Sequence, residues 1–251
     1  MRERFWEIDI LRGVAVISMV LYHFSYDLAY FVGLFDVGVF RSGVGLNAGR
    51  MIGGTFIFLA GLSLTLSYGR AVVSQPPGST PGGTLFWKYL GRGLRIFSYG
   101  LLITLFTWIF VPNEMIVFGI LHLIGASIVL AYRFLTLRLA NVALGLICIA
   151  VGLYLHDFGT THPWLAWMGI RPNFFMLDYW PIFPWFGVML LGVFAGNALY
   201  GDVSKQAART APRAPLSRPL AFLGRHSLLV YFVHQPILIA ALVLLGVARI
   251  A

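Results

Sequence analysis

Charged residues are scarce in this chain. Only 11% of its 251 residues are Asp, Glu, Lys or Arg, whereas 59% are apolar. A soluble domain usually carries about a quarter charged residues, and this sequence has too few to coat a water-facing surface. The mean hydropathy of +0.84 agrees. The scarcity excludes an ordinary soluble globule and indicates an integral membrane protein.

Acidic residues and cysteines are also rare. Nine acidic residues stand against 18 Lys and Arg, which gives a formal charge of +9. The basic residues fall between apolar stretches, and we find no nucleic-acid motif, so we attribute this charge to membrane orientation and anionic headgroups. Cys148 is the single cysteine. It excludes an internal disulfide and cannot make a zinc site by itself.

Long apolar runs are abundant, and a spanning helix needs about 20 such residues. Seven stretches qualify: Ile8–Phe35, Met51–Tyr68, Tyr89–Phe110, Met115–Phe134, Leu139–Leu155, Tyr179–Tyr200 and Ser227–Val247. The sequence predicts an all-α integral membrane protein with about seven transmembrane helices in one bundle. We expect a single domain over residues 1–251. The first stretch is interpreted as a retained helix, because no small-residue cleavage site follows it.

Three connections differ in composition from these stretches. Gln75–Gly83 is rich in Pro and Gly, so we expect a flexible loop there. Lys205–Pro219 is rich in Ala, Pro and Arg, and we expect a mobile basic loop. His156–Asp178 contains Trp and Pro residues, which suits a segment at the membrane interface.

The basic residues predict the orientation of the chain. If the N-terminus is cytoplasmic, the inner side holds Arg2, Arg4, Arg70, Lys88, Arg92, Arg95, Arg133, Arg138, Lys205, Arg209, Arg213, Arg218 and Arg225. The outer side then holds only Arg41, Arg50, Arg171 and Arg249, with Arg12 set aside as intramembrane. The positive-inside rule therefore favours a cytoplasmic N-terminus and an exported C-terminus, in the inner (plasma) membrane.

The first apolar stretch carries a stripe of ionisable residues, which are costly inside a bilayer and usually face an interior cavity. Arg12 and His23 are about three helical turns apart and share a face. His23 and Asp27 are spaced i, i+4 and can touch. A carboxylate beside an imidazole fixes its tautomer and raises its basicity. This pattern favours a general base, and a buried structural histidine is the alternative.

Two more histidines fall within apolar stretches. His122 has Gly119 and Gly125 three residues to either side, so a helix or a ligand can come close. A functional role and structural hydrogen bonding fit it equally well. The last stretch carries a polar face made of Ser227, Tyr231 and His234, with Gln235 adjoining it.

At 1.5 Å per residue, His23 lies about 20 Å from the cytoplasmic end of its stretch, His122 about 10 Å from the outer side and His234 about 10 Å from the cytoplasmic side. His23, His122 and His234 can therefore line one cavity with Arg12 at its cytoplasmic mouth. Arg92 and Arg95 could flank that mouth or serve only as positive-inside anchors. No zinc-motif spacing occurs, and we expect no metal.

Four collinear motifs resemble those of one family. They are Glu7–Ala15 with His23–Leu28, Phe118–Gly125, Asp178–Gly187 and Gly224–Pro236. In this order they resemble bacterial proteins related to the heparan-alpha-glucosaminide N-acetyltransferase catalytic domain. That family is part of a wider superfamily of membrane acyltransferases, and the resemblance covers nearly the whole chain.

The resemblance implies transfer of an acetyl group from cytoplasmic acetyl-CoA to an amino sugar or other glycan on the far side. It implies that His23 is the catalytic histidine and that Arg12 helps to hold the donor. Our catalytic candidates are thus His23 and Asp27. The donor-binding candidates are Arg12, Arg92 and Arg95, and the cavity candidates are His122, Tyr231, His234, Gln235 and Asp178. The expected partners are the bilayer, acetyl-CoA and the acceptor, and self-association is left open.

Two other classes of protein fit the same residues. A small transporter or proton-coupled carrier would use the histidines as relays, although we find no inverted repeat. A purely structural subunit would tolerate replacement of Arg12 and His23. Release of free CoA from acetyl-CoA would distinguish an acetyltransferase from a carrier and from a structural subunit.

The predicted topology can be checked with reporter fusions. A reporter fused after Ala251 should be exported, and one placed within Gln75–Gly83 should stay in the cytoplasm, because the basic residues favour that orientation. The opposite pattern of reporter activity would overturn the orientation and the side from which the donor enters.

Overall fold

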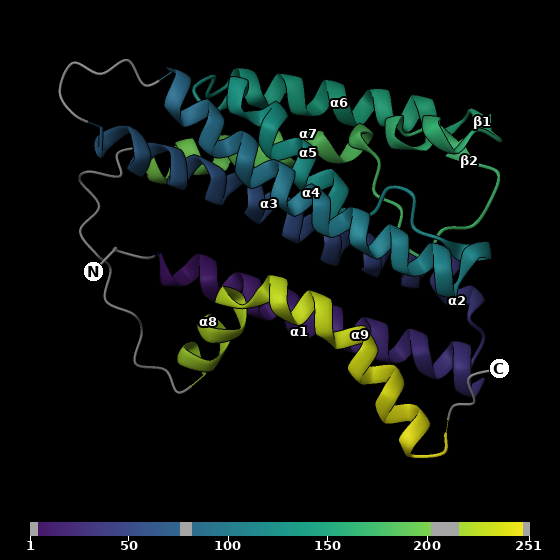
Figure 1. Cartoon of the computed structure of the whole chain (residues 1–251). Coiled ribbons are helices and arrows are strands. Elements are labelled where there is room, and N and C mark those ends of the chain that lie inside the picture. The colour runs from purple at the N-terminus through teal and green to yellow at the C-terminus, as the bar shows by residue number, and fades with distance from the viewer. Residues whose placement is uncertain (1–4, 76–81, 202–215, 248–251) are drawn as a thin grey trace. The chain divides into compact units, whose positions relative to one another are not determined.

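The computed structural model describes residues 5–75, 82–201 and 216–247. The chain divides into two compact units (Figure 1). The first unit comprises Met1–Phe56 and Ala207–Ala251, and the second comprises Ile57–Gln206.

Helices dominate both units. The first unit contains α1 (Trp6–Asp27), a π-helical turn (Leu28–Val32), α2 (Gly38–Arg41), the start of α3 (Gly43–Val73), α8 (Ser217–Arg225) and α9 (Ser227–Leu244). The second contains the rest of α3, α4 (Gly82–Phe110), α5 (Ile120–Ala131), α6 (Ala140–His156) and α7 (Ile182–Tyr200). Strands β1 (Gly159–Thr160) and β2 (Arg171–Pro172) form one short parallel pair. The all-α prediction is confirmed.

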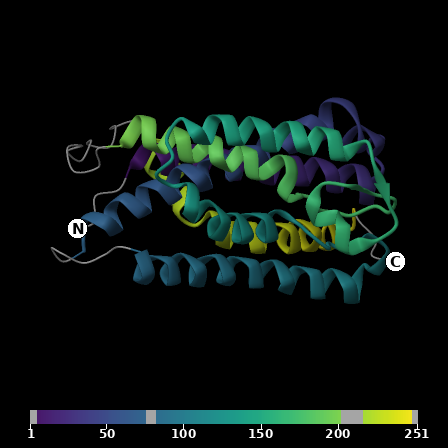
Figure 2. The same cartoon turned by 90° about the horizontal axis from the view of Figure 1, so that it is seen from above.

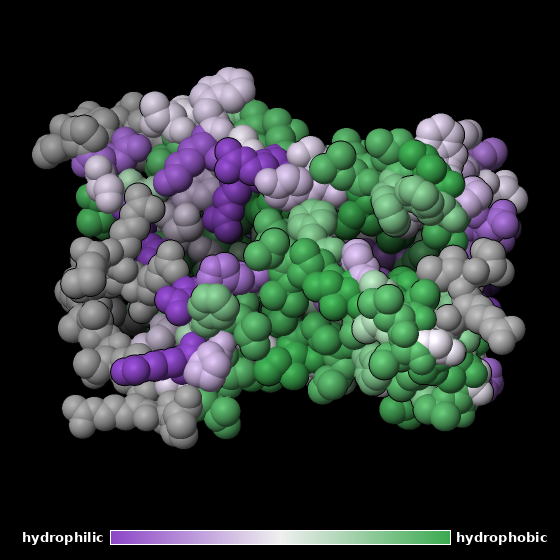
Figure 3. Space-filling view, turned by 60° about the horizontal axis from the view of Figure 1, so that its bottom comes forward, coloured by the Kyte–Doolittle hydropathy of each residue, from purple (hydrophilic) through white to green (hydrophobic). Residues whose placement is uncertain are grey.

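All seven apolar stretches form helices. Five of these helices are long and apolar enough to cross a membrane: Trp6–Val32, Gly43–Val73, Gly83–Phe110, Ile182–Tyr200 and Ser227–Leu244. The remaining two, Ile120–Phe134 and Ala140–His156, are shorter apolar helices. The face drawn in Figure 3 carries large hydrophobic areas. The chain is a multi-pass membrane protein, while seven spans and the orientation stay predictions.

The helix α5 begins five residues later than the apolar run that predicted it. The hydroxyl of Thr104 donates to the carbonyl of Ile116 at 2.6 Å, and the backbone N–H of Ile116 donates to the Thr107 hydroxyl at 3.1 Å. These bonds satisfy the Ile116 backbone outside a helix, so burial there carries no hydrogen-bond penalty. The segment before α5 is therefore an ordered loop against α4.

Two of the predicted loops fall largely outside the described residues. Of Gln75–Gly83, residues 76–81 are not described, and α4 begins at Gly82. Of Lys205–Pro219, residues 205–215 are not described, but Ser217 onward is helical in α8. The prediction of a loop up to Pro219 was wrong at this end. Proline is tolerated in the first turn of a helix, where its missing N–H has no partner to lose.

The segment His156–Asp178 carries β1, β2 and a 3₁₀ turn at Pro163–Met168. Trp164 is 65% exposed, as an aromatic residue at a membrane interface would be. The Tyr179 hydroxyl lies 2.9 Å from the carbonyl of Ala166 and 3.1 Å from that of Ile170. Burial raises the pKa of Tyr179, so its hydroxyl stays protonated and anchors the turn.

In the first unit, α8 packs on the start of α1 through two glycines. A Cβ on Gly13 would collide with the carbonyl oxygen of Leu220, and a Cβ on Gly224 would collide with that of Asp9. The two helix backbones therefore touch, which only residues without a side chain permit. This contact fixes α8 beside the part of α1 that bears Arg12.

In the second unit, glycines bring α6 and α7 together, and Figures 1 and 2 show these helices running side by side. A Cβ on Gly187 would meet the carbonyl oxygen of Gly145. The small-residue face Gly192–Gly196, which the sequence predicts to be a packing surface, meets α3: a Cβ on Gly192 would collide with the Phe58 carbonyl. That prediction is confirmed.

The contact between α1 and α8 predicts the effect of a single methyl group. Gly13→Ala should destabilise the protein by about 1–3 kcal/mol, because the new Cβ overpacks a backbone contact. Gly91→Ala, on α4, is the matched control, since nothing lies within 4 Å of its Cβ position and alanine favours a helix. Thermal unfolding in detergent should show a lower midpoint for Gly13→Ala only. Equal midpoints for the two variants would contradict the contact.

Candidate active site

The half-buried His23 and the buried His234, from different helices, meet in the first unit. His23 on α1 and His234 on α9 place their ring centroids 4.8 Å apart with an interplanar angle of 68°. His234 is 8% exposed. The sequence predicts a shared cavity for these two residues, and the structure brings them together. His122 belongs to the second unit, so the prediction of one cavity for all three histidines stays a prediction.

Backbone carbonyls fix the tautomers of both rings. Nδ1 of His23 donates to the carbonyl of Met19 at 2.9 Å. Nδ1 of His234 lies 2.8 Å from the carbonyl of Tyr231 and 3.1 Å from that of Val230. A carbonyl oxygen can only accept a hydrogen bond, so the proton of each neutral imidazole must sit on Nδ1. Nε2 of each ring then carries a lone pair and can act as a base.

Asp27 pairs with a different residue than the sequence predicts. Its side chain is fully buried, and Oδ1 accepts a hydrogen bond from Nε2 of Gln235 at 2.7 Å. The i, i+4 spacing suggests Asp27 as the residue that orients His23, yet Nδ1 of His23 is held by Met19. The orienting partner is thus a backbone carbonyl one turn before His23, which a search for paired ionisable residues does not find.

Three polar atoms of this group lack a hydrogen-bond partner among the described residues. They are Oδ2 of Asp27, Nε2 of His234 and Oε1 of Gln235, and all three are buried. Leaving a buried polar atom unpaired costs roughly 1–3 kcal/mol. Such atoms are rare in native proteins and point to a ligand, a water or an ion. We call His23, Asp27, His234 and Gln235 the histidine cluster.

Tyrosines border the histidine cluster. The ring of Tyr22 lies 5.7 Å from that of His23, and the ring of Tyr231 lies 5.9 Å from that of His234. A Cβ on Gly49 would meet the Tyr22 hydroxyl at 2.7 Å. Sequence reasoning found Tyr231 through its spacing from His234. It missed Tyr22, because a neighbour in sequence is turned about 100° away from the ionisable stripe.

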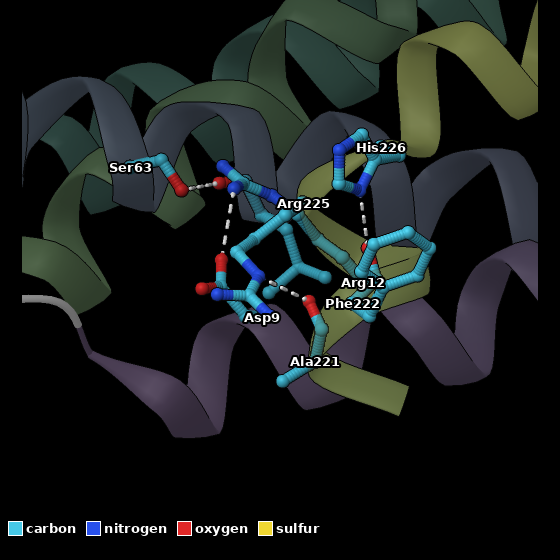
Figure 4. Close-up of polar contacts among 8 residues, drawn as sticks. Asp9, Arg12, Ser63, Ala221, Phe222, Arg225 and His226 are labelled. Atoms are coloured by element: carbon cyan, nitrogen blue, oxygen red, sulfur yellow. Dashed lines mark hydrogen bonds and ion pairs between the residues drawn. The ribbon is translucent and has the colours of Figure 1, made fainter. Parts of the chain in front are cut away.

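Arg12 lies near the start of α1, where α8 crosses it. Its guanidinium forms an ion pair with Asp9 at 3.7 Å. Gly224 of α8 contacts the Asp9 backbone, and Arg225 is the next residue. Arg225 therefore lies in the same region as Arg12 and Asp9 (Figure 4). Nε of Arg225 donates to its own helix at Ala221. The sequence did not reveal that Arg225 lies near Arg12, because the predicted loop extended to Pro219 and α8 was not recognised as a helix.

Arg92 and Arg95 lie on α4 in the second unit, and both side chains are exposed. They are three residues apart and therefore present neighbouring positions on the helix surface. Their proposed place beside Arg12 would join residues of both units. It stays a prediction.

His122 is fully hydrogen-bonded within the second unit. Its Nδ1 accepts from the backbone N–H of Gly119 at 3.2 Å, and its Nε2 lies 3.3 Å from the Thr104 hydroxyl. That hydroxyl donates to the carbonyl of Ile116, so it accepts the proton of Nε2. His122 therefore holds the opposite tautomer to His23, with no lone pair to spare. These contacts favour the structural alternative for His122.

Asp178 also serves the start of α5. Its Oδ2 accepts a hydrogen bond from the backbone N–H of Ile120 at 2.9 Å, and a Cβ on Gly119 would collide with the same oxygen. A carboxylate at a helix N-terminus is favoured by the unpaired N–H groups there. His122 and Asp178 thus lie at the same helix end. Within the described ranges, no group of three or more His, Cys, Asp or Glu could hold a metal ion.

The fold and these residues define a multi-pass membrane protein in which His23 and His234 form a contacting pair. Residues 4–236 match the family model of the heparan-alpha-glucosaminide N-acetyltransferase catalytic domain. The chain belongs to this family of membrane acyltransferases, as its motifs indicated. No curated protein and no solved structure matches the chain.

The hydrogen bonds of His122 predict a loss of stability when it is replaced. His122→Ala should lower the free energy of unfolding by about 2 kcal/mol or more, because it leaves a cavity and an unpaired Gly119 N–H. Thr104→Val removes one hydroxyl at similar volume and should cost less. Thermal unfolding of both variants in detergent checks the order. A wild-type midpoint for His122→Ala would contradict the structural role.

Proposed function

We propose that the chain is an acetyltransferase that moves an acetyl group from cytoplasmic acetyl-CoA to an amino sugar or glycan across the inner membrane. The family supports the acyl-transfer chemistry, and acetyl-CoA is the donor its members generally use. His23 is the general base of the proposed reaction. One observation carries this assignment: Nδ1 of the half-buried His23 ring donates to a backbone carbonyl, which leaves the lone pair on Nε2 available to accept a proton.

The donor is proposed to be held by Arg12. Acetyl-CoA carries phosphates and cannot cross a bilayer, so a guanidinium near the cytoplasmic end of α1 is suited to bind it. Arg12 and His23 are eleven residues apart, which corresponds to about 16 Å along the helix. The long, thin pantetheine arm can bridge that distance and bring the thioester to the histidine cluster. Arg92 and Arg95 are proposed as additional donor contacts.

The proposed step transfers one proton and one acetyl group. Nε2 of His23 removes the proton from an acceptor amine or hydroxyl as that atom attacks the thioester carbonyl. The carbon–sulfur bond breaks, and the imidazolium returns its proton to the CoA thiolate. The products are the acetylated acceptor and free CoA. His234, whose ring contacts that of His23, can share the proton while it resides on the cluster.

The test separates donor binding from chemistry in purified protein. Wild-type protein should release free CoA from acetyl-CoA in the presence of an acceptor such as glucosamine. His23→Ala should reduce this rate about 10²–10⁴-fold, the usual contribution of a general base, while acetyl-CoA binding measured by titration is retained. Arg12→Ala should instead weaken acetyl-CoA binding.

His226→Ala is the matched control for His23→Ala. His226 makes the same bond from Nδ1 to a carbonyl four residues earlier, at Phe222, but it is exposed. Its replacement should leave turnover near the wild-type value. Near-normal turnover of His23→Ala would remove its assignment as the base. If wild-type protein neither binds acetyl-CoA nor releases CoA, the transferase proposal fails and a carrier becomes the better reading.

A further inference from the structure

The three unpartnered atoms of the histidine cluster share one property: each accepts hydrogen bonds. Oε1 of Gln235 is an amide oxygen, and Oδ2 of Asp27 carries no proton when the carboxyl is ionised, so both oxygens can only accept hydrogen bonds. Nε2 of His234 carries a lone pair because Nδ1 donates to the backbone. Within the described part of the chain none of the three finds a donor. The histidine cluster therefore has more hydrogen-bond acceptors than donors, and an N–H or O–H group is needed to satisfy them.

The burial of these atoms makes the shortage costly. Asp27 is 0% exposed and His234 is 8% exposed, so bulk solvent does not supply the missing donors. No basic side chain among the described residues forms an ion pair with Asp27; its one described partner is the Gln235 amide. A buried carboxylate is stabilised by a cation or by several donated hydrogen bonds. The missing component is a group with several donors.

The positions of the three atoms place that group beside the histidine pair. Asp27 lies one helical turn after His23 on α1, and Gln235 directly follows His234 on α9. Two contacts join α1 to α9 here: the hydrogen bond between Asp27 and Gln235, and the ring contact between His23 and His234. On α1 these contacts are one helical turn apart. A group held by Asp27 and Gln235 therefore lies within about one helical turn of the histidine pair.

We propose that Asp27, Gln235 and His234 form a subsite that binds a donor-rich group of the acceptor, either an ammonium or a set of hydroxyls. The identification of the occupant as the acceptor rests on the proposed function. The thioester and phosphates of acetyl-CoA present mainly acceptor atoms, so this subsite disfavours those parts of the donor. Asp27 is then an acceptor-binding residue rather than the residue that orients His23.

The experiment measures sugar binding directly, without turnover. Purified wild-type protein is titrated calorimetrically with glucosamine, which carries an ammonium and hydroxyls, and with glucose, which carries hydroxyls only. At least one sugar should bind saturably. Asp27→Asn should weaken that binding at least about 10-fold, because it keeps the shape and the bond to Gln235 but replaces an acceptor oxygen with an NH₂ group. Acetyl-CoA binding should not change.

Asp36→Asn is the matched control. Asp36 lies in the same unit and is exposed, and its carboxylate accepts from the Gly38 N–H. Its replacement makes the same change in charge and should leave sugar binding unaltered. Binding of glucosamine alone would assign an ammonium to the subsite. Equal binding of both sugars would assign hydroxyls.

Two results would contradict the proposed subsite. One is no saturable binding of either sugar to the wild type, and the other is equal sugar affinities for Asp27→Asn and Asp36→Asn. If Asp27→Asn does not fold, Gln235→Met takes its place, since it deletes Oε1 and must weaken sugar binding in the same way. Sugar binding that depends on Asp27 in a protein that never releases CoA would retain the subsite while the proposed transferase function fails.

Discussion

Inside a bilayer no water is at hand for a polar side chain, so every imidazole nitrogen must find its partner in the protein or in a ligand. This constraint separates the histidines of the chain into two kinds. His122 satisfies both nitrogens, one with the Gly119 N–H and one with Thr104. His23 and His234 each satisfy Nδ1 with backbone carbonyls. The same residue type is thus structural in one unit and has a basic nitrogen in the other.

Close helix packing is what allows these arrangements to form. Glycines let α8 touch α1 next to Arg12 in the first unit, and they let α4 approach α5 near His122 in the second, where a Cβ on Gly100 would meet the His122 ring at 2.8 Å. Lipid supplies little hydrophobic driving force between helices, so small residues and interhelical hydrogen bonds contribute most to association. The bond from Gln235 to Asp27 is one such contact, and it ties α9 to the end of α1.

Much of the fold and part of the site follow from the sequence. Hydropathy locates all seven helical stretches, and helical spacing places His23 and Asp27 on one face. The sequence predicts one cavity for His23, His122 and His234, and the structure brings His23 and His234 together. Spacing does not reveal which atoms form hydrogen bonds. The partner of His23 is the backbone carbonyl of Met19, and because every residue has such a carbonyl, the residue type gives no signal. The helix α8 was missed for a related reason, since the Pro and Arg residues around its start resemble a loop and its packing depends on distant Gly13.

The proposed role of His23 depends most directly on where the imidazole protons sit. Nitrogen-15 NMR of histidine-labelled protein in lipid bilayers at neutral pH distinguishes protonated from unprotonated ring nitrogens, and single replacements assign each signal. We predict neutral His23 and His234 with the proton on Nδ1, and neutral His122 with the proton on Nε2. A proton on Nε2 of His23 in the unliganded protein would contradict the proposed role, because that nitrogen could not then serve as the base.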